Sequence, residues 1–290
     1  MGIRKWTGSK QDYSELHHCL LILIKEVDRI CRKHNIQYFL DSGTLLGAVR
    51  HKGFIPWDDD ADIGMLRKDF EKFKEVCTFE LSENFGIDHK NDMAIYLKGT
   101  VRTVLKEGIN EHIALDVFPY DHVPKNSFLR LIHMYIGIFW KNVKLYKNGI
   151  RIKYKTSLFG KIIKLSVIIT SCLLKLSHIE KILDFCLSFY NRFDTGMLSK
   201  NIGSAYSFKR NTVPEKILSD VKLGAFEDSE FYILTHYDHM LKSWYGDYMK
   251  LPPEYAELQG IDPEHWSFVT RTAHPIDMFD PGDWTDSRKK

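Results

Sequence analysis

The chain has 290 residues, of which 44% are hydrophobic and 27% are charged, and its formal net charge is +3 at pH 7. These values are ordinary for a soluble globular protein that can hold a full-sized core. Its cysteines are odd in number, widely spaced and set among apolar residues, which argues against a disulfide framework or a zinc cluster. We therefore expect buried thiols at Cys19, Cys31, Cys77, Cys172 and Cys186.

No Pro-rich or Gly-rich linker divides the chain, so we expect one elaborated α/β domain. Its parts would be a catalytic core in residues 1–121, a basic helical insertion in residues 122–205 and a C-terminal return in residues 206–290 that completes the site. The N-terminus contains no apolar signal segment, and its sixth residue is Trp6, where a myristoylation site favours Ser or Thr. We therefore expect a cytoplasmic protein.

The first predicted helix covers residues 13–34. Apolar side chains recur there at helical spacing, and Lys25, Asp28 and Arg32 lie opposite them. The elements predicted after it are a strand at 37–40, a short helix whose first residues are 44–49, a helix at 69–77, and strands at 94–97 and 113–118.

The most informative stretch joins the turn Ser42-Gly43-Thr44 to the run Trp57-Asp58-Asp59-Asp60-Ala61-Asp62. Four aspartates so close together repel one another, so they need a cation, hydrogen-bond donors or open water. If Asp60 and Asp62 lie on a strand, both side chains point to one face and can reach the same metal ions. The exposed N–H groups of the upstream turn attract phosphate. The sequence thus predicts a phosphate cradle beside a hard divalent cation, which phosphoryl transfer requires.

Two other interpretations of the acidic run are considered. An EF-hand loop that starts at Asp58 needs glycine at its sixth position and a bidentate Glu at its twelfth, but the chain has Ile63 and Asp69 there. A solvated acidic turn after Pro56 would need no ligand. However, Asp62 continues into an apolar strand, where an unpartnered charge is unfavourable.

Asp116 lies in Ile113-Ala114-Leu115-Asp116-Val117-Phe118, which has the composition of a buried strand. An unpaired carboxylate would be expensive there. Two such strands side by side would bring Asp60, Asp62 and Asp116 together as a three-carboxylate site.

The string from Phe39 to Ile63 resembles the LicD family, to which the fukutin-type enzymes are related. Its Ser-Gly turn before an Asp-x-Asp strand looks like the nucleotidyltransferase superfamily fold. Residues 113–121 and 244–253 are similar to the family's second acidic strand and closing motif. The resemblance runs from about residue 15 to 255 and is weak between about 122 and 205. It implies an α/β fold with a nucleotidyltransferase-type mixed sheet flanked by helices.

The resemblance also implies the activity. It suggests a Mg²⁺-dependent enzyme that transfers phosphocholine from CDP-choline to a sugar hydroxyl of a teichoic acid or lipopolysaccharide precursor and releases CMP. Asp60, Asp62 and Asp116 would hold Mg²⁺, with Mn²⁺ as the alternative, and Asp116 is either a ligand only or also the group that takes the proton of the acceptor hydroxyl. The turn residues Ser42, Gly43 and Thr44 would position the phosphate.

Three other functions share this pattern. The donor can be another CDP-activated polyol phosphate, such as CDP-ribitol or CDP-glycerol. The enzyme can be a nucleotidyltransferase that uses a nucleoside triphosphate. A non-catalytic glycan-binding protein would tolerate loss of Asp60 or Asp62, yet all three acidic positions are present.

Further residues are candidates for substrate binding. Arg102 lies between the acidic motifs and suits a forked contact with a diphosphate, and Arg50 is a similar candidate. Asp247 can cap a turn or reach the active centre. A choline group is held by aromatic faces through cation–π attraction, for which the candidates are Trp57, Tyr120, Trp244, Tyr245 and Tyr248.

The middle of the chain is basic. Between Asp121 and Glu180 it contains no acidic residue and eleven Lys and Arg residues. Residues 158–176 are apolar, but Lys161, Lys164 and Lys175 leave too short an uncharged run to span a bilayer. With Ser171, these lysines fall near one face of a helix.

Such a basic amphipathic helix can lie in an anionic membrane surface, or it can bury its apolar face in the protein's own core. Residues 128–140 pose the same question. We expect a lipid-linked glycan acceptor and peripheral contact with the inner face of the cell membrane through residues 125–181. No nucleic-acid recognition module is visible, so no nucleic acid is expected.

Overall fold

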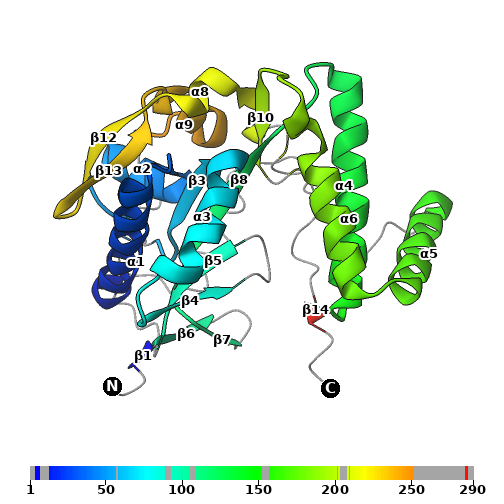
Figure 1. Cartoon of the computed structure of the whole chain (residues 1–290), viewed down its shortest axis with the longest axis horizontal. Coiled ribbons are helices and arrows are strands. Elements are labelled where there is room, and N and C mark those ends of the chain that lie inside the picture. The colour runs from blue at the N-terminus through cyan, green and yellow to red at the C-terminus, as the bar shows by residue number, and fades with distance from the viewer. Residues whose placement is uncertain are drawn as a thin grey trace. The chain divides into compact units, whose positions relative to one another are not determined.

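The computed structural model describes most of the chain. The described residues are 4–6, 13–56, 58–88, 93–98, 100–104, 109–151, 157–200, 202, 208, 210–250 and 285–286. They form two compact units, shown with their elements in Figure 1. Unit 1 combines Met1–Tyr120 with Lys216–Pro275, and unit 2 combines Asp121–Glu215 with Ile276–Lys290.

A mixed sheet forms the centre of unit 1, as predicted. Strand β3 pairs in parallel with β8 and antiparallel with β2, while β5 pairs antiparallel with both β8 and β4. The strands are β2 (Phe39–Leu40), β3 (Asp62–Leu66), β4 (Phe85–Asp88), β5 (Met93–Leu97) and β8 (Ala114–His122). A separate small sheet contains β1 (Arg4–Trp6), β6 (Thr100–Val104) and β7 (Ile109–Glu111).

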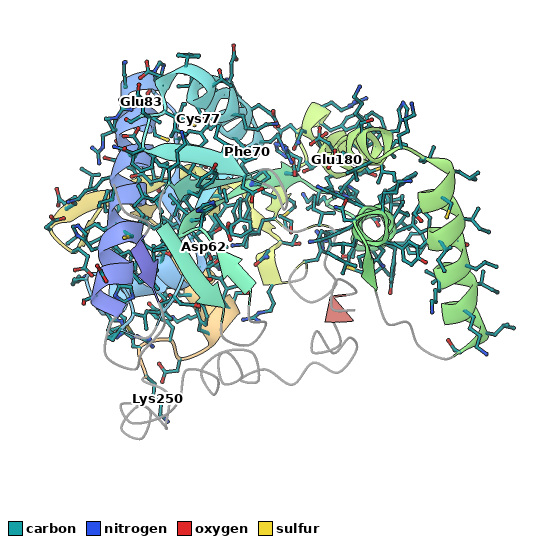
Figure 2. All side chains as sticks on the ribbon, turned by 90° about the horizontal axis from the view of Figure 1, so that it is seen from below. Asp62, Phe70, Cys77, Glu83, Glu180 and Lys250 are labelled. Atoms are coloured by element: carbon teal, nitrogen blue, oxygen red, sulfur yellow. The ribbon has the colours of Figure 1, made fainter. Side chains whose placement is uncertain are left out.

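Helices α1 (Tyr13–His34) and α3 (Arg67–Glu80) contact each other and strands of this sheet, and they cover one of its faces (Figure 1). The prediction of α1 is confirmed, because the apolar side chains at helical spacing are buried. Helix α3 is longer than the predicted 69–77, and its residues Phe70 and Cys77 are buried (Figure 2). Helix α2 (Ser42–Arg50) begins two residues earlier than residue 44.

The C-terminal part of unit 1 begins with α8 (Glu215–Ser219). A hairpin of β12 (Val221–Phe226) and β13 (Ser229–Leu234) follows, and then α9 (Tyr237–Tyr245). The hairpin and α9 both contact α2 or its flanking strand. This part of the chain therefore lies beside the turn predicted to bind phosphate.

Unit 2 is mainly helical. Helices α4 (Ser127–Lys147), α5 (Leu158–Leu173) and α6 (Leu176–Ser188) pack around Val143, Val167 and Ile179. The last residues of β8, Asp121 and His122, pair with β10. The remaining elements are β9 (Ile150–Arg151), the 3-10 helix η1 (Phe189–Arg192), β10 (Met197–Ser199), β11 (Val213–Pro214) and β14 (Thr285–Asp286).

Several expectations for unit 2 need correction. The apolar run 158–176 is not one helix, because α5 ends at Leu173 and α6 begins at Leu176. Ser171, expected beside the lysines of α5, is 2% exposed, and its hydroxyl donates to the Ile168 carbonyl. Cys172 is exposed and Cys186 is half-buried, so only Cys19, Cys31 and Cys77 are the buried thiols expected. Among the helices described, none has the length and apolar character needed to cross a membrane.

Candidate active site

Two acidic residues meet at the start of β3. Asp62, the first residue of that strand, is the register partner of Asp116 in the parallel strand β8, and the Asp116 N–H donates to the Ala61 carbonyl at 3.0 Å. Side chains of partnered residues lie on the same face of a sheet. Leu115 and Val117 are buried on the opposite face, whereas the Asp116 side chain is exposed. The expectation that Asp116 is a buried carboxylate was wrong, because strand alternation points it outward.

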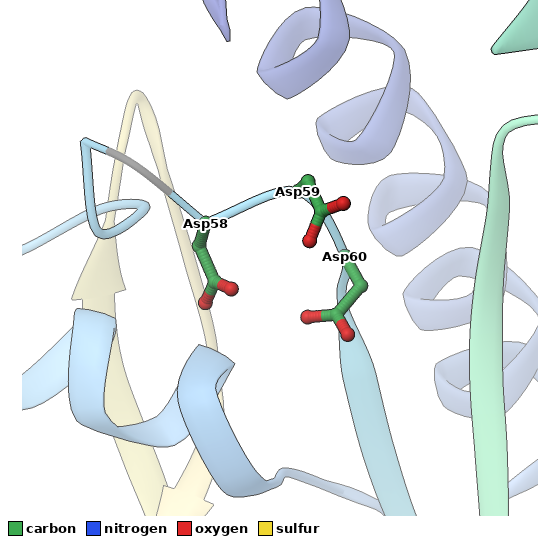
Figure 3. Close-up of side chains that lie close together, drawn as sticks. All are labelled: Asp58, Asp59 and Asp60. Atoms are coloured by element: carbon green, nitrogen blue, oxygen red, sulfur yellow. The ribbon is translucent and has the colours of Figure 1, made fainter. Parts of the chain in front are cut away.

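The loop before β3 holds three more carboxylates. Oxygen atoms of Asp58, Asp59 and Asp60 lie within 4.8 Å of one another, and Figure 3 shows their carboxyl groups turned toward one another. Because β3 begins at Asp62, Asp60 lies in this loop and not on the strand as predicted.

The electrostatics of the loop link it to β3. Burial raises the pKa of Asp58 well above its usual value, and the charges of Asp60, Asp62 and Asp59 raise it further. A hydrogen bond with the Asp60 carboxyl acts in the same direction. Asp58, Asp60 and Asp62 therefore share one site, and a positive charge there would be strongly favourable.

Asp41 joins the phosphate turn to the acidic strand, and the sequence did not identify it as functional. It is fully buried, caps α2 by accepting from the Ser42 N–H at 2.7 Å, and its own N–H donates to the Asp62 carbonyl at 3.0 Å. The Tyr120 hydroxyl donates to both carboxylate oxygens, at 3.2 and 3.1 Å. A buried Asp directly before Ser-Gly at a helix start was the available signal.

Tyr120, which is buried in β8, supports the position of the Asp41 carboxylate. Burial and then the nearby charge of Asp41 raise the pKa of Tyr120 well above its usual value, so its hydroxyl stays protonated and donates. The ring is fully buried. A buried ring offers no face to a ligand in this conformation, which leaves Tyr120 as a support for Asp41.

The phosphate turn is itself constrained by the acidic strand. Thr44 is 2% exposed, and its hydroxyl accepts from the Asp62 N–H at 2.8 Å. Ser42 has a φ of 47°, in the left-handed region that non-glycine residues rarely adopt. A Cβ on Gly43 would lie 2.6 Å from Oδ2 of Asp58, so only glycine lets the Asp58 carboxyl approach the start of α2. Phosphate binding by this turn stays a prediction.

The closing segment brings one aromatic residue to the carboxylates. Burial raises the pKa of Tyr245, and the charges of Asp58, Asp62, Asp41 and Asp60 raise it further. The Tyr245 hydroxyl therefore lies near this acidic group, although 37% of the residue is exposed. Trp244 and Tyr248, in contrast, are buried.

The other predicted residues of this segment have structural contacts. The Arg50 Nη1 donates to the Tyr248 carbonyl at 2.9 Å, which ties α2 to the closing segment. The Tyr248 hydroxyl donates to Oδ1 of Asp238 at 2.9 Å. Asp247 is exposed, and its backbone carbonyl accepts from the Lys250 N–H at 3.1 Å.

Two predicted residues cannot be placed at the site. Trp57 lies outside the described residues. Arg102 lies in β6, opposite Trp6 in β1 and Glu111 in β7, and its side chain is outside the described part. Their roles stay predictions.

His17 is a neighbour of the acidic loop that the sequence did not indicate. Its Nε2 lies 2.8 Å from the Asp58 carbonyl oxygen, and its ring stacks on Phe54 with 4.5 Å between centroids. Burial lowers the pKa of His17. The neutral ring therefore donates from Nε2 and holds the backbone of the loop. A histidine on the buried side of a long helix has no local signal for such a role.

The chemistry of the donors fits a hard divalent cation. Asp58, Asp59 and Asp60 present carboxylate oxygens only, the ligand type that Mg²⁺, Ca²⁺ and Mn²⁺ prefer, and the charge of Asp62 acts on the same group. Burial chiefly raises the pKa of Asp58, and a cation would relieve the further contribution from the charges of Asp60, Asp62 and Asp59. The N-terminal end of α2 lies against this group, where a ligand phosphate would meet both N–H donors and a cation.

Comparisons with known proteins show what the chain is similar to. Residues 35–147 match the family described as LicD/FKTN/FKRP, nucleotidyltransferase domain. The chain is 29% identical over 244 residues to the lipopolysaccharide cholinephosphotransferase LicD of Haemophilus influenzae, an alignment that covers 78% of this chain and 86% of that protein. It is 55% identical over 119 residues to the uncharacterized protein RP689 of Rickettsia prowazekii, which covers 34% of this chain and 41% of that protein.

A shorter similarity links the chain to the human ribitol 5-phosphate transferase FKRP, with 38% identity over 55 residues, which is 18% of this chain and 11% of that protein. Both named enzymes are phosphotransferases. Residues 35–147 of this chain are therefore similar to the nucleotidyltransferase domain of the LicD/FKTN/FKRP family.

Proposed function

We propose that this protein transfers phosphocholine from CDP-choline to a sugar hydroxyl of a teichoic acid or lipopolysaccharide precursor and releases CMP. The observation that supports it most is the parallel register of Asp62 with Asp116, which sets two carboxylates side by side next to the start of α2. The similarity to a cholinephosphotransferase over 78% of the chain supports the choice of donor.

In this proposal Asp60, Asp62 and Asp116 would hold Mg²⁺, or alternatively Mn²⁺, and Asp58 is close enough to Asp60 to contribute. A bound cation would supply positive charge that offsets the negative charge of the diphosphate. The backbone N–H groups at Gly43 and Thr44 orient the phosphate, while the Thr44 hydroxyl and Asp41 keep that turn in register with β3.

The reaction exchanges the phosphoanhydride bond of the donor for a phosphodiester bond. The sugar oxygen forms a bond to the phosphorus of phosphocholine as the bond from that phosphorus to the CMP oxygen breaks, in line with the attack. The proton of the sugar hydroxyl passes to Asp116, whose side chain is exposed on the sheet face. CMP carries away the electron pair of the broken bond.

Tyr245 is the aromatic residue best placed for the choline group. It is partly exposed and its hydroxyl lies among carboxylates, so a quaternary ammonium would meet both a ring and negative charge. CDP-ribitol is the second candidate donor, because of the local similarity to the ribitol 5-phosphate transferase. A ribitol chain would gain nothing from a cation–π contact, so the two donors are distinguishable.

Isothermal titration tests the donor and the site together. CDP-choline, CDP-ribitol, CDP-glycerol and CTP are titrated in Mg²⁺ and in EDTA into the wild type, Asp60→Asn/Asp62→Asn and the surface control Glu75→Gln/Glu83→Gln. We expect Mg²⁺-dependent preference for CDP-choline in the wild type and the control, and no binding in the site variant. Equal or absent binding of CDP-choline would reject the choline assignment.

The proposed acceptor is a lipid-linked glycan at the inner face of the cell membrane. The name of the relative in Haemophilus influenzae, which specifies lipopolysaccharide, supports this acceptor. Release of CMP only in the presence of a lipid-linked precursor, measured by chromatography, is the expected result. Equal release with free sugars would argue against it.

A further inference from the structure

Helix α5 of unit 2 has two apolar faces. Val167 is fully buried with Val143 of α4 and Ile179 of α6. On the opposite side, apolar residues spaced three and four apart form one row along the helix. This row, the α5 stripe, contains Leu158, Ile162, Leu165, Ile169 and Leu173, whose exposed fractions are 76%, 54%, 58%, 49% and 78%.

Helix α4 exposes a second apolar row, which leads along the helix to the part of α4 that α5 covers. Phe128, Ile132 and Tyr135 are 69%, 41% and 57% exposed. Phe139 and Val143 follow on the same side of α4, and they pack into the cluster that α5 covers. Within the described part of unit 2, α5 packs at the C-terminal half of this side of α4 (Figure 1), while the apolar side chains of the N-terminal half stay exposed.

Basic residues surround these apolar rows. Residues 122–179 contain no acidic residue and eleven Lys and Arg. Lys161 and Lys164 are exposed along one edge of the α5 stripe, and the exposed Lys175 follows its end. Helix α6 of unit 2 contains the acidic residues Glu180 and Asp184. Oε1 of Glu180 lies 3.5 Å from Nζ of Lys144, and Asp184 is exposed. The immediate border of the stripe is thus positive.

We propose that the exposed rows of α4 and α5 dock this protein on an anionic lipid bilayer. Apolar side chains bordered by lysines match the boundary between acyl chains and negatively charged headgroups. A second copy of the chain fits less well, because a two-fold contact would set the same basic surface against itself. One face of α5 packs on the protein, and in this proposal the exposed face enters lipid.

The surface lies outside the acidic site, so the docking proposal does not depend on the donor. The biological role of docking would be access to a lipid-linked acceptor, and this role rests on the proposed function. Lipid binding and donor binding can be measured separately, and failure of either leaves the other interpretable.

Flotation of the full-length protein with vesicles tests the proposal. The vesicles are phosphatidylcholine alone and phosphatidylcholine with phosphatidylglycerol. One variant, Ile162→Ser/Leu165→Ser/Ile169→Ser, removes the apolar stripe, and another, Lys161→Glu/Lys164→Glu/Lys175→Glu, reverses its charge. The matched controls are Phe79→Ser/Leu223→Ser and Lys68→Glu/Lys216→Glu/Lys250→Glu, all at exposed positions of unit 1.

We expect at least roughly tenfold tighter binding to the anionic vesicles, because each basic residue near a negative surface contributes several-fold to the affinity. In both stripe variants the affinity for anionic vesicles should fall by about tenfold or more, while the controls should bind as the wild type does. Since the replaced residues are exposed, all variants should keep the wild-type circular dichroism.

Equal binding to both vesicles, or unchanged binding by the stripe variants, would overturn the proposal. So would a concentration-dependent dimer in light scattering that Ile162→Ser/Leu165→Ser/Ile169→Ser abolishes, because the surface would then belong to a second copy. Donor titration on the same variants separates the two questions, since docking variants should bind donor normally.

Discussion

Single residues at the site show the conflict that a cation would resolve. Asp58 is held between the start of α2 and its acidic neighbours, so its carboxylate form is disfavoured. Asp41 is fully buried, whereas Asp58 is half-buried, and Asp41 accepts from the Ser42 N–H and the Tyr120 hydroxyl. Asp58 instead lies near the charges of Asp60, Asp62 and Asp59, so a cation would relieve repulsion at the loop and not at the cap.

Asp58→Asn should raise the thermal stability of the metal-free protein at neutral pH. Removing one charge from the cluster relieves repulsion of about 1 kcal/mol, which corresponds to a midpoint increase of roughly 2–4 °C. The gain in midpoint on adding millimolar MgCl₂ should become smaller than in the wild type. Differential scanning fluorimetry with and without MgCl₂ measures both, with Glu75→Gln as the control. A lower midpoint without metal would contradict the expected repulsion.

Glu26 provides a pH-dependent contribution to stability that is remote from the site. Its carboxylate accepts from Arg29 at 2.9 Å and from the Ser82 hydroxyl at 2.7 Å, and the Arg29 contact chiefly lowers the pKa of Glu26 to about 2. Because the pKa in the folded state is depressed, this stability is present above the ordinary value of 4.5 and is lost as the pH falls toward about 2.

Glu26→Gln should therefore lower the free energy of unfolding at pH 7 by about 1–2 kcal/mol, a value reduced for solvent screening because Arg29 is partly exposed. The difference from the wild type should shrink as the pH falls below 4.5. Urea unfolding at several pH values measures it. The exposed Glu15→Gln on the same helix serves as the comparison, and a pH-independent difference would reject the linkage.

At the scale of elements, the β12–β13 hairpin positions the loop that leads to the carboxylates. The Glu227 N–H at its turn donates to the Lys52 carbonyl at 2.8 Å, and its carboxylate accepts from the Phe54 N–H at 2.9 Å. Phe54 in turn stacks on His17, which holds the Asp58 carbonyl. The hairpin, α1 and the acidic loop therefore form one chain of contacts.

Glu227→Ala should destabilise the protein by about 1–3 kcal/mol, because it leaves the buried Phe54 N–H without its acceptor. The Mg²⁺ affinity should also fall, since the loop that carries Asp58 loses a restraint. Urea unfolding and Mg²⁺ titration are the two measurements. Glu230→Ala on the same hairpin should change neither, and an equal effect of both substitutions would show that the contact with Phe54 is not responsible.

At the scale of the whole molecule, charge is segregated along the chain. Residues 122–179 contain eleven basic residues and no acidic one, while residues 211–286 contain fifteen acidic residues and five basic ones. The net charge of +3 conceals this difference. Any partner recognised through charge therefore meets a positive segment and a negative one, each with its own preference.

Binding to anionic vesicles should weaken as NaCl is raised and should not vanish completely. Salt screens the lysines over about 10 Å at roughly 0.1 M, but it does not remove the apolar contribution of the α5 stripe. Flotation at increasing NaCl measures the slope. Lys161→Glu/Lys164→Glu/Lys175→Glu should flatten that slope, whereas Lys68→Glu/Lys216→Glu/Lys250→Glu should retain it. Salt-independent binding by the wild type would rule out the electrostatic part.

Local patterns in the sequence determined the type and order of the main elements. The 13–34 helix follows from apolar residues at helical spacing, and the strands containing Asp62 and Asp116 follow from their β-branched and apolar neighbours. Both signals depend only on residues near in sequence. The same is true of the acidic run, which by its own repulsion already implied a cation or other compensation.

Tertiary structure alone decided how those pieces meet. The register of Asp62 with Asp116, the donation from Tyr120 to Asp41 and the support of the Asp58 loop by His17 join residues far apart in the chain. The sequence also could not decide which apolar side of α5 is buried, because both sides are apolar and only the packing of Val167 against α4 and α6 distinguishes them. Pairing between distant segments is set by the sum of many weak contacts, which no short window of sequence contains.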